Sequence, residues 1–493
     1  MHEAPCSYFF ENSVDFDYAP ALLYRLYTLR LHFDQRKNKR CKGDQPIMSD
    51  KTPATSEKRE MWSGKLAFIL ASAGSAIGLG NIWMFPWRMG TYGGSAFLLI
   101  YLVIIALIGL VALMGEFAFG RANKTGPIGA VKAAFAQRKL PGGAVVGLLP
   151  VLATGAVTVF YMIVVGWVLY YVGLALRGFA GQDLAVAFNS FAGSAGAVPW
   201  HVIAVVMTTA IVYAGVKKGL EPVNNILLPA LFVILVVLAV RALTLPGAQE
   251  GLRFIFTPDF SQLANPLTWF NALAQALFSL SLLGCTLVIY GSYLPKKADI
   301  PQAAAYTALF DTLAAILAAL IVFPTAFAFG VAPNAGIPLL FITLPSLFAQ
   351  MPAGALFGTL FFLLVAFASI TSAVSLFESA VEPMMDALKW DRKKATLATG
   401  ALSLIIGLPL TVNQPLFSTW MRFTSAIIMP VGTLIMMVVI FWVYGSARIR
   451  KEVNEGTATP MAAWWDFLGK YVAVIVTLLI LVGGALRYFG LWK

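Results

Sequence analysis

The sequence predicts an all-α polytopic membrane protein, and three observations support this fold class. Of the 493 residues, 59% are hydrophobic and only 12% are charged, and the mean hydropathy of +0.79 is too high for a soluble protein. Apolar runs of about 20 residues, the length that a helix needs to cross a bilayer core, recur from residue 66 to the end of the chain. Lys and Arg gather in every second connection between these runs.

Eleven membrane-spanning helices follow from the apolar runs. Their expected ranges are 66–88, 94–119, 145–177, 199–216, 223–243, 267–293, 303–332, 355–386, 394–411, 421–444 and 466–489. Between the seventh and the eighth, the apolar segment PNAGIPLLFITLPSLFAQMPAG is interrupted by prolines and glycines. We therefore expect a helical hairpin on the outer surface there. If this segment spanned the membrane instead, the count would be twelve.

The basic connections predict the orientation of the chain. The richest of them are KREMWSGK, RANKTGPIGAVKAAFAQRK, KWDRKK and ARIRK. Because the cytoplasmic loops of membrane proteins carry the excess of Lys and Arg, these connections are expected to be cytoplasmic. The N-terminus is then inside and, with eleven helices, the C-terminus is outside. This loop bias accounts for most of the net charge of +12, so no nucleic-acid partner is needed to explain it.

Residues 1–60 differ from the rest, because they form a polar tail without the apolar core of a secretory signal. Met48 begins an ordinary polar start that runs into the first helix, so we expect Met48 to be the initiator and residues 1–47 not to be translated. The cysteines and histidines are too scattered to predict a disulfide framework, a metal site or a catalytic centre. They are Cys6, Cys41, Cys285, His2, His32 and His201.

Two of the expected helices contain residues that interrupt a helix. AGSAIGLGNIWMFP, residues 73–86, carries three glycines, an asparagine and a proline, and FSLSLLGCT, residues 278–286, carries three hydroxyls and a glycine. Taken alone, such glycines favour close helix packing. Paired interruptions in the first and sixth helices are instead typical of the midplane binding site of a transporter. Half-helix ends there offer bare N–H groups to an anion and bare C=O groups to a cation.

The chain resembles, in order, the signatures of the neurotransmitter:sodium symporter family, from about Trp62 to the end of the tenth helix. The matching stretches are MWSGKLAFILASAGSAIGLGNIWMFP, YGGSAFLLIYL, GEFAFGR, GVKKGLEPVNNILLP, TPDFSQL, FSLSL, IYGSYLPK, GIPLLFITLP and FASITSAVSLFE. The resemblance implies two inverted five-helix repeats, residues 61–245 and 246–445, with broken helices 1 and 6. A cytoplasmic loop and an eleventh helix follow at residues 446–493.

The resemblance also implies a function. The eleven-helix count is similar to that of the bacterial amino-acid transporters of the family, which import an amino acid with sodium by alternating access and are not enzymes. We therefore expect the protein in the lipid bilayer of the bacterial cytoplasmic (inner) membrane. A channel would need a continuous polar path, which the sequence does not offer. An amino-acid binding receptor of the same fold, with altered or lost transport, remains the alternative.

The resemblance implies two sodium sites. One lies between helices 1 and 8, and its implied ligands are the carbonyls of Gly74, Ile77 and Ala368 and the side chains of Thr371 and Ser372. The other lies next to the substrate, with the Ala76 carbonyl, Asn81, Ser279 and Asp311 as ligands. Taken alone, the hydroxyls would bond back to their own helix, and Asn81 would be a helix breaker. An ionisable Asp311 inside the membrane does, however, require a partner.

The substrate-binding residues are also carried over from the resemblance. The substrate carboxylate would meet the N–H groups of Leu79 and Gly80 and the hydroxyl of Tyr161, which alone would suggest a packing tyrosine. The amine would meet Ser281 and the carbonyls of Ala76, Phe278 and Ser279, and the side-chain pocket would be formed by Val157, Phe278, Gly284 and Leu376. Monoamine carriers have an aspartate at the position of Gly78, so this substrate should bring its own carboxylate. The apolar pocket favours an apolar or aromatic amino acid.

Some positions depart from the family pattern. An outer-gate arginine and its aspartate partner are replaced by Met84 and Met421, which leaves Met84, Phe278, Met421 and Arg422 as the gate candidates. The usual glycine-rich turn of the sixth helix is Leu283, Gly284 and Cys285. Glu116 resembles a buried glutamate that braces the broken first helix. Ala315 replaces the serine that holds chloride in animal members, and Asp311 replaces their neutral asparagine, so two sodium ions without chloride are expected.

Overall fold

The computed structural model describes residues 60–331, 336 and 338–492, and within these residues the regular secondary structure is entirely helical. The expected N-terminal tail, Met48 included, lies outside the described residues except for Glu60. Among the residues that the structure describes, nine helices are long and apolar enough to span a membrane, and the bent pair Lys65–Ala76 and Gly80–Thr91 adds a tenth span. The eleventh expected span is the sixth helix, which the structure divides into α12 (Pro266–Ser279) and α13 (Thr286–Ser292). An all-α polytopic fold with broken helices 1 and 6 is thus confirmed.

The continuous spans match the expected ranges closely except for the tenth, which was expected over 421–444 and extends over Gln414–Val453. They comprise α4 (Gly94–Ile104) with α5 (Leu110–Asn123), α7 (Gly143–Arg177), α9 (Val198–Tyr213), α10 (Glu221–Leu243), α14 (Ile300–Ala328), α16 (Gly354–Leu388), α17 (Arg392–Thr411), α18 (Gln414–Phe423) with α19 (Met429–Val438) and α20 (Ser446–Val453), and α21 (Trp464–Phe467) with α22 (Val474–Tyr488). Where two or three helices form one span, five- to seven-residue π-helical segments join them.

Shorter helices lie between the spans. They are α6 (Pro127–Gln137), α8 (Leu184–Phe191), α11 (Ala248–Phe256) and α15 (Leu344–Gln350). The segment expected as a hairpin contains one apolar helix, Leu339–Gln350, which is shorter than the roughly 20 residues that a span requires. The twelve-helix alternative is therefore not supported.

Local sequence signals explain where several spans begin. An Asn or Asp stands just before the first turn, and its side-chain oxygen accepts the backbone N–H of the residue two or three positions later. Where a proline occupies the first turn, its nitrogen carries no hydrogen and therefore needs no acceptor. Asn265 caps α12 in this way at 3.0 Å, and Asp299 caps α14 at 3.0 Å. Asp391 and Asn413 cap α17 and α18 at 2.7 and 3.0 Å.

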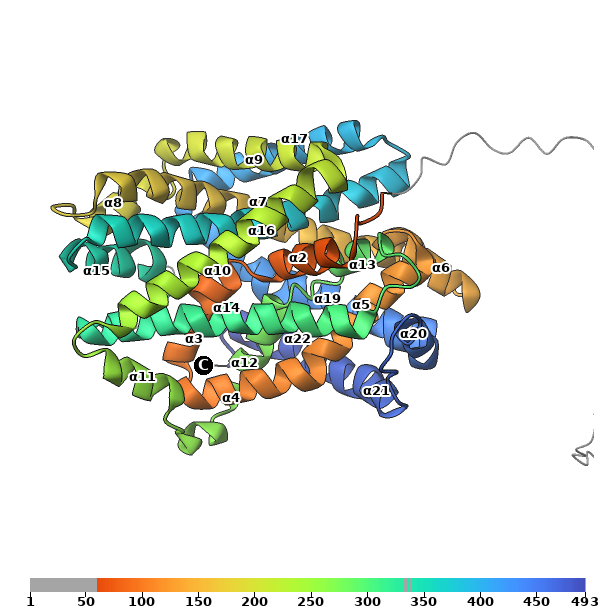
Figure 1. The fold of residues 1–493 in the computed structure, drawn as a ribbon. Helices are drawn as coiled ribbons and strands as arrows, with labels where there is room; N and C mark the ends of the chain where they lie inside the picture. Colours follow the sequence, from red (N-terminus) through yellow and green to blue (C-terminus); the bar gives the residue numbers. More distant parts are fainter. Residues whose placement is uncertain (1–59, 332–335, 337, 493) are drawn as a thin grey trace, which may run out of the picture. The chain divides into compact units, whose positions relative to one another are not determined.

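The first broken helix lies inside the bundle. Its first half, α2 (Lys65–Ala76), contacts α10, α14 and α16, and it lies among these helices in Figure 1. The sixth helix has different neighbours for its two halves: α12 packs on α4 and α22, whereas α13 packs on α5. Both breaks are thus enclosed by long, continuous helices.

The contact between α5 and α13 is unusually close. A Cβ atom on Gly120 would stand 1.9 Å from the carbonyl oxygen of Val288, and one on Gly291 would stand 2.3 Å from that of Phe117. Neither distance is compatible with a side chain, so two backbones meet here directly. The half of the sixth helix after its break is therefore held against a continuous span.

Candidate functional site

The first break begins where α2 ends at Ala76. Ile77 adopts an extended conformation, with φ −74° and ψ 106°, and the chain resumes with the π-helical turn Gly80–Met84 and α3 (Phe85–Thr91). The two halves are bent by 48°. Backbone groups around Gly78 therefore lose their helical partners in the interior of the protein, where each must be satisfied in another way.

Side chains from α7 and α16 approach this exposed backbone. The Ser372 hydroxyl lies 3.4 Å from the Gly74 carbonyl and 3.2 Å from the Ile77 carbonyl, and the Tyr161 hydroxyl accepts the N–H of Leu79 at 3.4 Å. A Cβ atom on Gly78 would stand 2.4 Å from the Ser372 hydroxyl oxygen. The aspartate that monoamine carriers have at this position therefore does not fit here without a rearrangement.

The predicted ligands of the sodium between helices 1 and 8 come together in one buried cluster. Beside Ser372, the Thr371 hydroxyl donates to the Ala368 carbonyl at 3.0 Å, and a Cβ atom on Gly74 would lie 3.4 Å from the Cβ of Thr371. Every group in the cluster is a neutral oxygen, which suits a monovalent cation. The bond between Thr371 and Ala368 is also the back-bonding that a hydroxyl makes in any helix, so this bond alone does not distinguish the two interpretations.

Two of the predicted ligands of the second sodium, Asn81 and Ser279, contact the carboxylate of Asp311, which is fully buried on α14. Its oxygens accept hydrogen bonds from the Asn81 amide at 2.7 Å and from the Ser279 hydroxyl at 2.9 and 3.0 Å. Tyr101 on α4 donates to it at 3.0 Å. The Ala76 carbonyl lies at the end of α2, where the break begins. Side chains from three other elements therefore converge on the buried carboxylate of Asp311.

The Asn81 amide faces this carboxylate with its NH₂ group, while its oxygen accepts the N–H of Gly78 at 3.1 Å. In this orientation the Asn81 NH₂ group donates a hydrogen bond to the Asp311 carboxylate. A cation at the same place needs oxygen, so the amide would have to turn over and release the N–H of Gly78. Cation binding at Asp311 and the conformation of the first break are thereby linked.

The second break, residues 280–285, contains two residues with positive φ, Ser281 at 54° and Gly284 at 76°. The Ser281 hydroxyl donates to the Ser75 carbonyl at 2.6 Å, which ties the two breaks together. The Gly284 N–H donates to Glu116 at 3.3 Å, so Glu116 braces the sixth helix, and the expectation that it braces the first was wrong. A Cβ atom on Gly284 would stand 2.8 Å from the Gly432 carbonyl and 2.9 Å from the Cβ of Met436, so this position lies against α19.

A cavity of about 740 Å³ leads from one end of the bundle to the first break. Its inner end is formed by Leu79, Tyr161 and Phe278, and all four gate candidates line it: Met84, Phe278, Met421 and Arg422. Val157 and Leu376 do not line the cavity and are buried near its inner end, where the neighbour of Val157, Thr158, donates to the Leu376 carbonyl at 3.3 Å. Leu79 and Tyr161, two of the three predicted carboxylate contacts, thus face open space, whereas Val157 and Leu376 of the predicted side-chain pocket are buried.

Four residues of the site were missed from the sequence. Tyr101 contacts Asp311, and Gln275 donates to the Gly80 carbonyl at 2.9 Å. Arg88 and Arg487 line the cavity. Tyr101 and Gln275 are polar residues within apolar runs, and this pattern could have indicated a role in the site. Nothing in the sequence places the two arginines in a common cavity.

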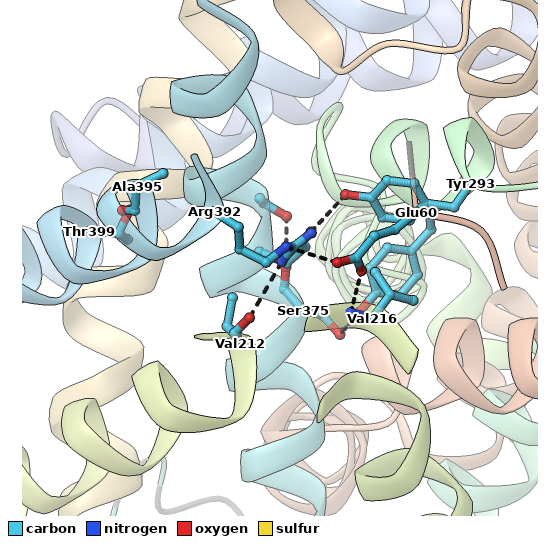
Figure 2. A network of polar contacts seen from close by, with 11 residues as sticks. Glu60, Val212, Val216, Tyr293, Ser375, Arg392, Ala395 and Thr399 are labelled. Carbon is cyan, nitrogen blue, oxygen red and sulfur yellow. Dashed lines mark hydrogen bonds and ion pairs between the residues drawn. The ribbon is translucent and has the colours of Figure 1, made fainter. Parts of the chain in front are cut away.

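The opposite end of the bundle, which carries the basic connections, is closed by ion pairs of Arg392 with a buried and a more exposed glutamate (Figure 2). Arg392 binds Glu378 with two hydrogen bonds of 2.8 and 2.9 Å, and it lies 3.3 Å from Glu60. Tyr293 donates to Glu378 at 2.7 Å, and Glu60 accepts the N–H of Val216 at 2.5 Å. The beginning of the described chain is thereby fastened to α16, α17 and the turn before α10.

Two interrupted helices inside a bundle of long spans, with a cavity that reaches the first break from one end of the bundle, are features of a secondary transporter. The chain belongs to the sodium:neurotransmitter symporter family, whose model matches residues 59–180 and 179–491. This confirms the resemblance found in the sequence.

Within residues 60–331, 336 and 338–492, no group of three or more His, Cys, Asp or Glu is arranged to hold a metal ion.

Relatives of this chain are named as sodium-dependent transporters. One from Methanocaldococcus jannaschii is 35% identical over 448 residues, covering 85% of this chain and 89% of the relative. YhdH of Bacillus subtilis is 34% identical over 450 residues, covering 87% of this chain and 98% of the relative. The crystal structure of MhsT in complex with L-phenylalanine superposes with a TM-score of 0.77 at 35% identity, covering 87% of this chain and all of MhsT.

The closed end allows a stability prediction. Glu378 has a fully buried side chain, so changing Arg392 to Gln leaves a buried carboxylate without its cation, which destabilises a protein by about 3 to 5 kcal/mol. We expect a clearly lower melting temperature for Arg392→Gln in detergent and partial recovery when Glu378→Gln is added.

Arg450→Gln is the matched control. It breaks the more exposed pair with Asp466, an interaction worth about 0 to 1 kcal/mol. Equal melting temperatures for Arg392→Gln and Arg450→Gln would show that the Arg392 pair does not hold this end together.

Proposed function

We propose that the protein is a symporter that imports an apolar or aromatic amino acid with sodium across the bacterial cytoplasmic membrane. One observation carries the proposal: backbone carbonyls of the broken first helix and hydroxyls of α16 form a cluster of neutral oxygens directly behind a cavity. Family membership supports sodium dependence, and the phenylalanine bound to MhsT supports the substrate class.

Two sodium ions have separate roles in this proposal. One binds the Gly74, Ile77 and Ala368 carbonyls with Thr371 and Ser372, and thereby fixes the distance between α2 and α16. The other binds beside Asp311 with Asn81, Ser279, the Ala76 carbonyl and the substrate carboxylate. Because the substrate is itself a ligand of this ion, neither binds well without the other, and transport is coupled.

The substrate occupies the inner end of the cavity. Its carboxylate accepts the N–H groups of Leu79 and Gly80 and the Tyr161 hydroxyl, and its amine contacts carbonyls of the two breaks. The absence of an acidic side chain at Gly78 supports a substrate with its own carboxylate. Its side chain reaches toward Val157, Phe278 and Leu376. Val157 and Leu376 must move apart to admit it, because they are buried in this structure.

The two ends of the molecule support alternating access. The basic end is cytoplasmic by the positive-inside rule, so the N-terminus is inside and the cavity faces outward. The ion pairs of Arg392 then close the cytoplasmic route while the outer route stays open. Import requires the opposite arrangement, in which Met84, Phe278 and Met421 close the cavity through apolar contacts and the Arg392 pairs separate.

A receptor that binds an amino acid without transporting it is the second candidate. The loss of the gate pair at Met84 and Met421 favours it, since this pair closes the outer route in the family. Counterflow of labelled phenylalanine in sodium-loaded proteoliposomes separates the two candidates. Exchange against internal phenylalanine supports the symporter, and sodium-dependent binding without exchange supports the receptor.

Removing the hydroxyls of Thr371 and Ser372 tests the first sodium site. The double variant Thr371→Ala and Ser372→Ala loses two of five oxygens from one ion, so the sodium concentration for half-maximal binding should rise about tenfold or more, which corresponds to about 1.4 kcal/mol. Sodium titration at saturating phenylalanine measures this. The control Ser369→Ala removes a buried hydroxyl of the same helix that donates to the Ala366 carbonyl of its own helix. An unchanged titration in the double variant would contradict the assignment.

Asp311 predicts independence from chloride. A chloride ion next to an ionised Asp311 would experience like-charge repulsion of several kcal/mol at an effective dielectric constant of about 20. Transport should therefore run equally well when gluconate replaces chloride. Asp311→Asn should slow it about tenfold or more, since a charged partner of the ion is lost. Adding Ala315→Ser one turn later should restore activity only with chloride. A wild-type protein that needs chloride would refute this role of Asp311.

A further inference from the structure

The side-chain amide of Asn224 lies beside the predicted sodium cluster. Asn224 is fully buried on α10, one helical turn after Glu221, where this helix begins. Its Nδ2 atom donates to the Leu220 carbonyl at 2.8 Å, and this bond fixes which end of the amide is the oxygen. Among the described residues, no donor makes a hydrogen bond to the Asn224 Oδ1 atom. Because a buried polar atom without a partner is costly inside a membrane protein, this oxygen points to a ligand.

The Asn224 oxygen is directed at α2. A Cβ atom on Gly74 would stand 2.0 Å from the Asn224 Oδ1 atom and 3.4 Å from the Cβ of Thr371. The amide and the Thr371 side chain therefore reach the same side of Gly74, whose carbonyl is one of the proposed sodium ligands. Since α10 packs on both α2 and α16, a third helix meets the cluster here and brings an oxygen to it.

Close packing of α10 on Gly74 is the alternative explanation of this contact. The amide oxygen would then have at most a Cα–H group as its partner, which is a weaker donor than an N–H group. An apolar side chain would fill the same space without burying a polar atom. The next buried residues along this helix are indeed apolar, and they are Leu228, Leu231 and Leu235. The polar residue thus stands at the position that adjoins the sodium cluster.

We propose that the Asn224 oxygen is a further ligand of the sodium ion between α2 and α16, in addition to the three carbonyls and two hydroxyls named above. The inference rests on the proposed function, because this ion is the one that the transporter carries. An amide oxygen is neutral like the other ligands, so it adds a contact without holding the ion too tightly for release. The bond to Leu220 keeps the oxygen in place and connects the ion to the π-helical turn Val216–Leu220. Sodium therefore joins α10, as well as α16, to α2.

The test follows sodium binding through the melting temperature of the full-length protein in detergent, with choline replacing sodium at constant ionic strength. Asn224→Leu replaces the amide by an apolar group of similar size. The sodium concentration for half-maximal stabilisation should rise about tenfold or more, because the ion loses one oxygen. The control Asn225→Leu changes the exposed neighbour on the same helix and should leave this concentration unchanged. A lower melting temperature at every sodium concentration, with an unchanged midpoint, would indicate packing alone and refute the ligand.

Asn224→Asp separates the oxygen from the amide bond. This variant keeps an oxygen beside Gly74 but loses the Nδ2 atom that donates to Leu220. We expect its half-maximal sodium concentration to be equal to or below that of the wild type, because a carboxylate attracts the cation. If Asn224→Asp required as much sodium as Asn224→Leu, the bond to Leu220 would be the function of this side chain, and the ligand would be refuted.

Double variants identify which ion Asn224 contacts. Adding Asn224→Leu to Thr371→Ala should raise the sodium requirement by clearly less than tenfold, because both changes act on one ion, whereas adding it to Asp311→Asn should have its full effect. The opposite pattern would refute the assignment to the cluster between α2 and α16. A wild-type protein without any sodium-dependent stabilisation would contradict the proposed transport function as well. A normal sodium response in both the wild type and Asn224→Leu would refute the ligand alone.

Discussion

The structure depends on a constraint of the membrane interior, where a backbone N–H or C=O group without a partner costs several kcal/mol. The chain leaves helical geometry at Ile77 and again at Ser281, and both places lie in the middle of the bundle. Ser372, Tyr161 and Gln275 each contribute a polar atom to the first break. The long helices α7 and α16, together with α12, the first half of the broken sixth helix, therefore support the break in the first helix.

The same polar groups explain why ion and substrate binding belong to one event. A hydroxyl that now contacts a carbonyl can turn to a cation, and a tyrosine that now accepts the N–H of Leu79 can donate to a carboxylate. Asp311 differs from these neutral hydroxyl and carbonyl groups because it is a carboxylate, which needs a partner or water when it is buried. Its present partners are donors from Asn81, Ser279 and Tyr101, and each of these can be exchanged for a cation without leaving the carboxylate bare.

Sequence patterns predicted the spans and both breaks, because apolar length and helix-breaking residues are local properties. They also predicted residues that the structure brings together, such as Thr371 with Gly74. They failed where the outcome depends on the direction of a side chain. Glu116 could have braced either break, Gly284 could have faced α7 or α19, and Arg88 could have pointed to lipid. These side-chain directions depend on packing between segments that are far apart in the chain, and the hydrophobic periodicity of one segment contains no information about it.

The backbone contact between α5 and α13 has an evolutionary consequence. Positions such as Val157 and Leu376 can change with the substrate, because their neighbours are side chains that can be exchanged in turn. Gly120 and Gly291 have no such freedom, since their neighbours are carbonyl oxygens that every residue carries. Evolution within this fold can therefore change the substrate specificity, whereas the two glycines at the α5–α13 contact have to be conserved.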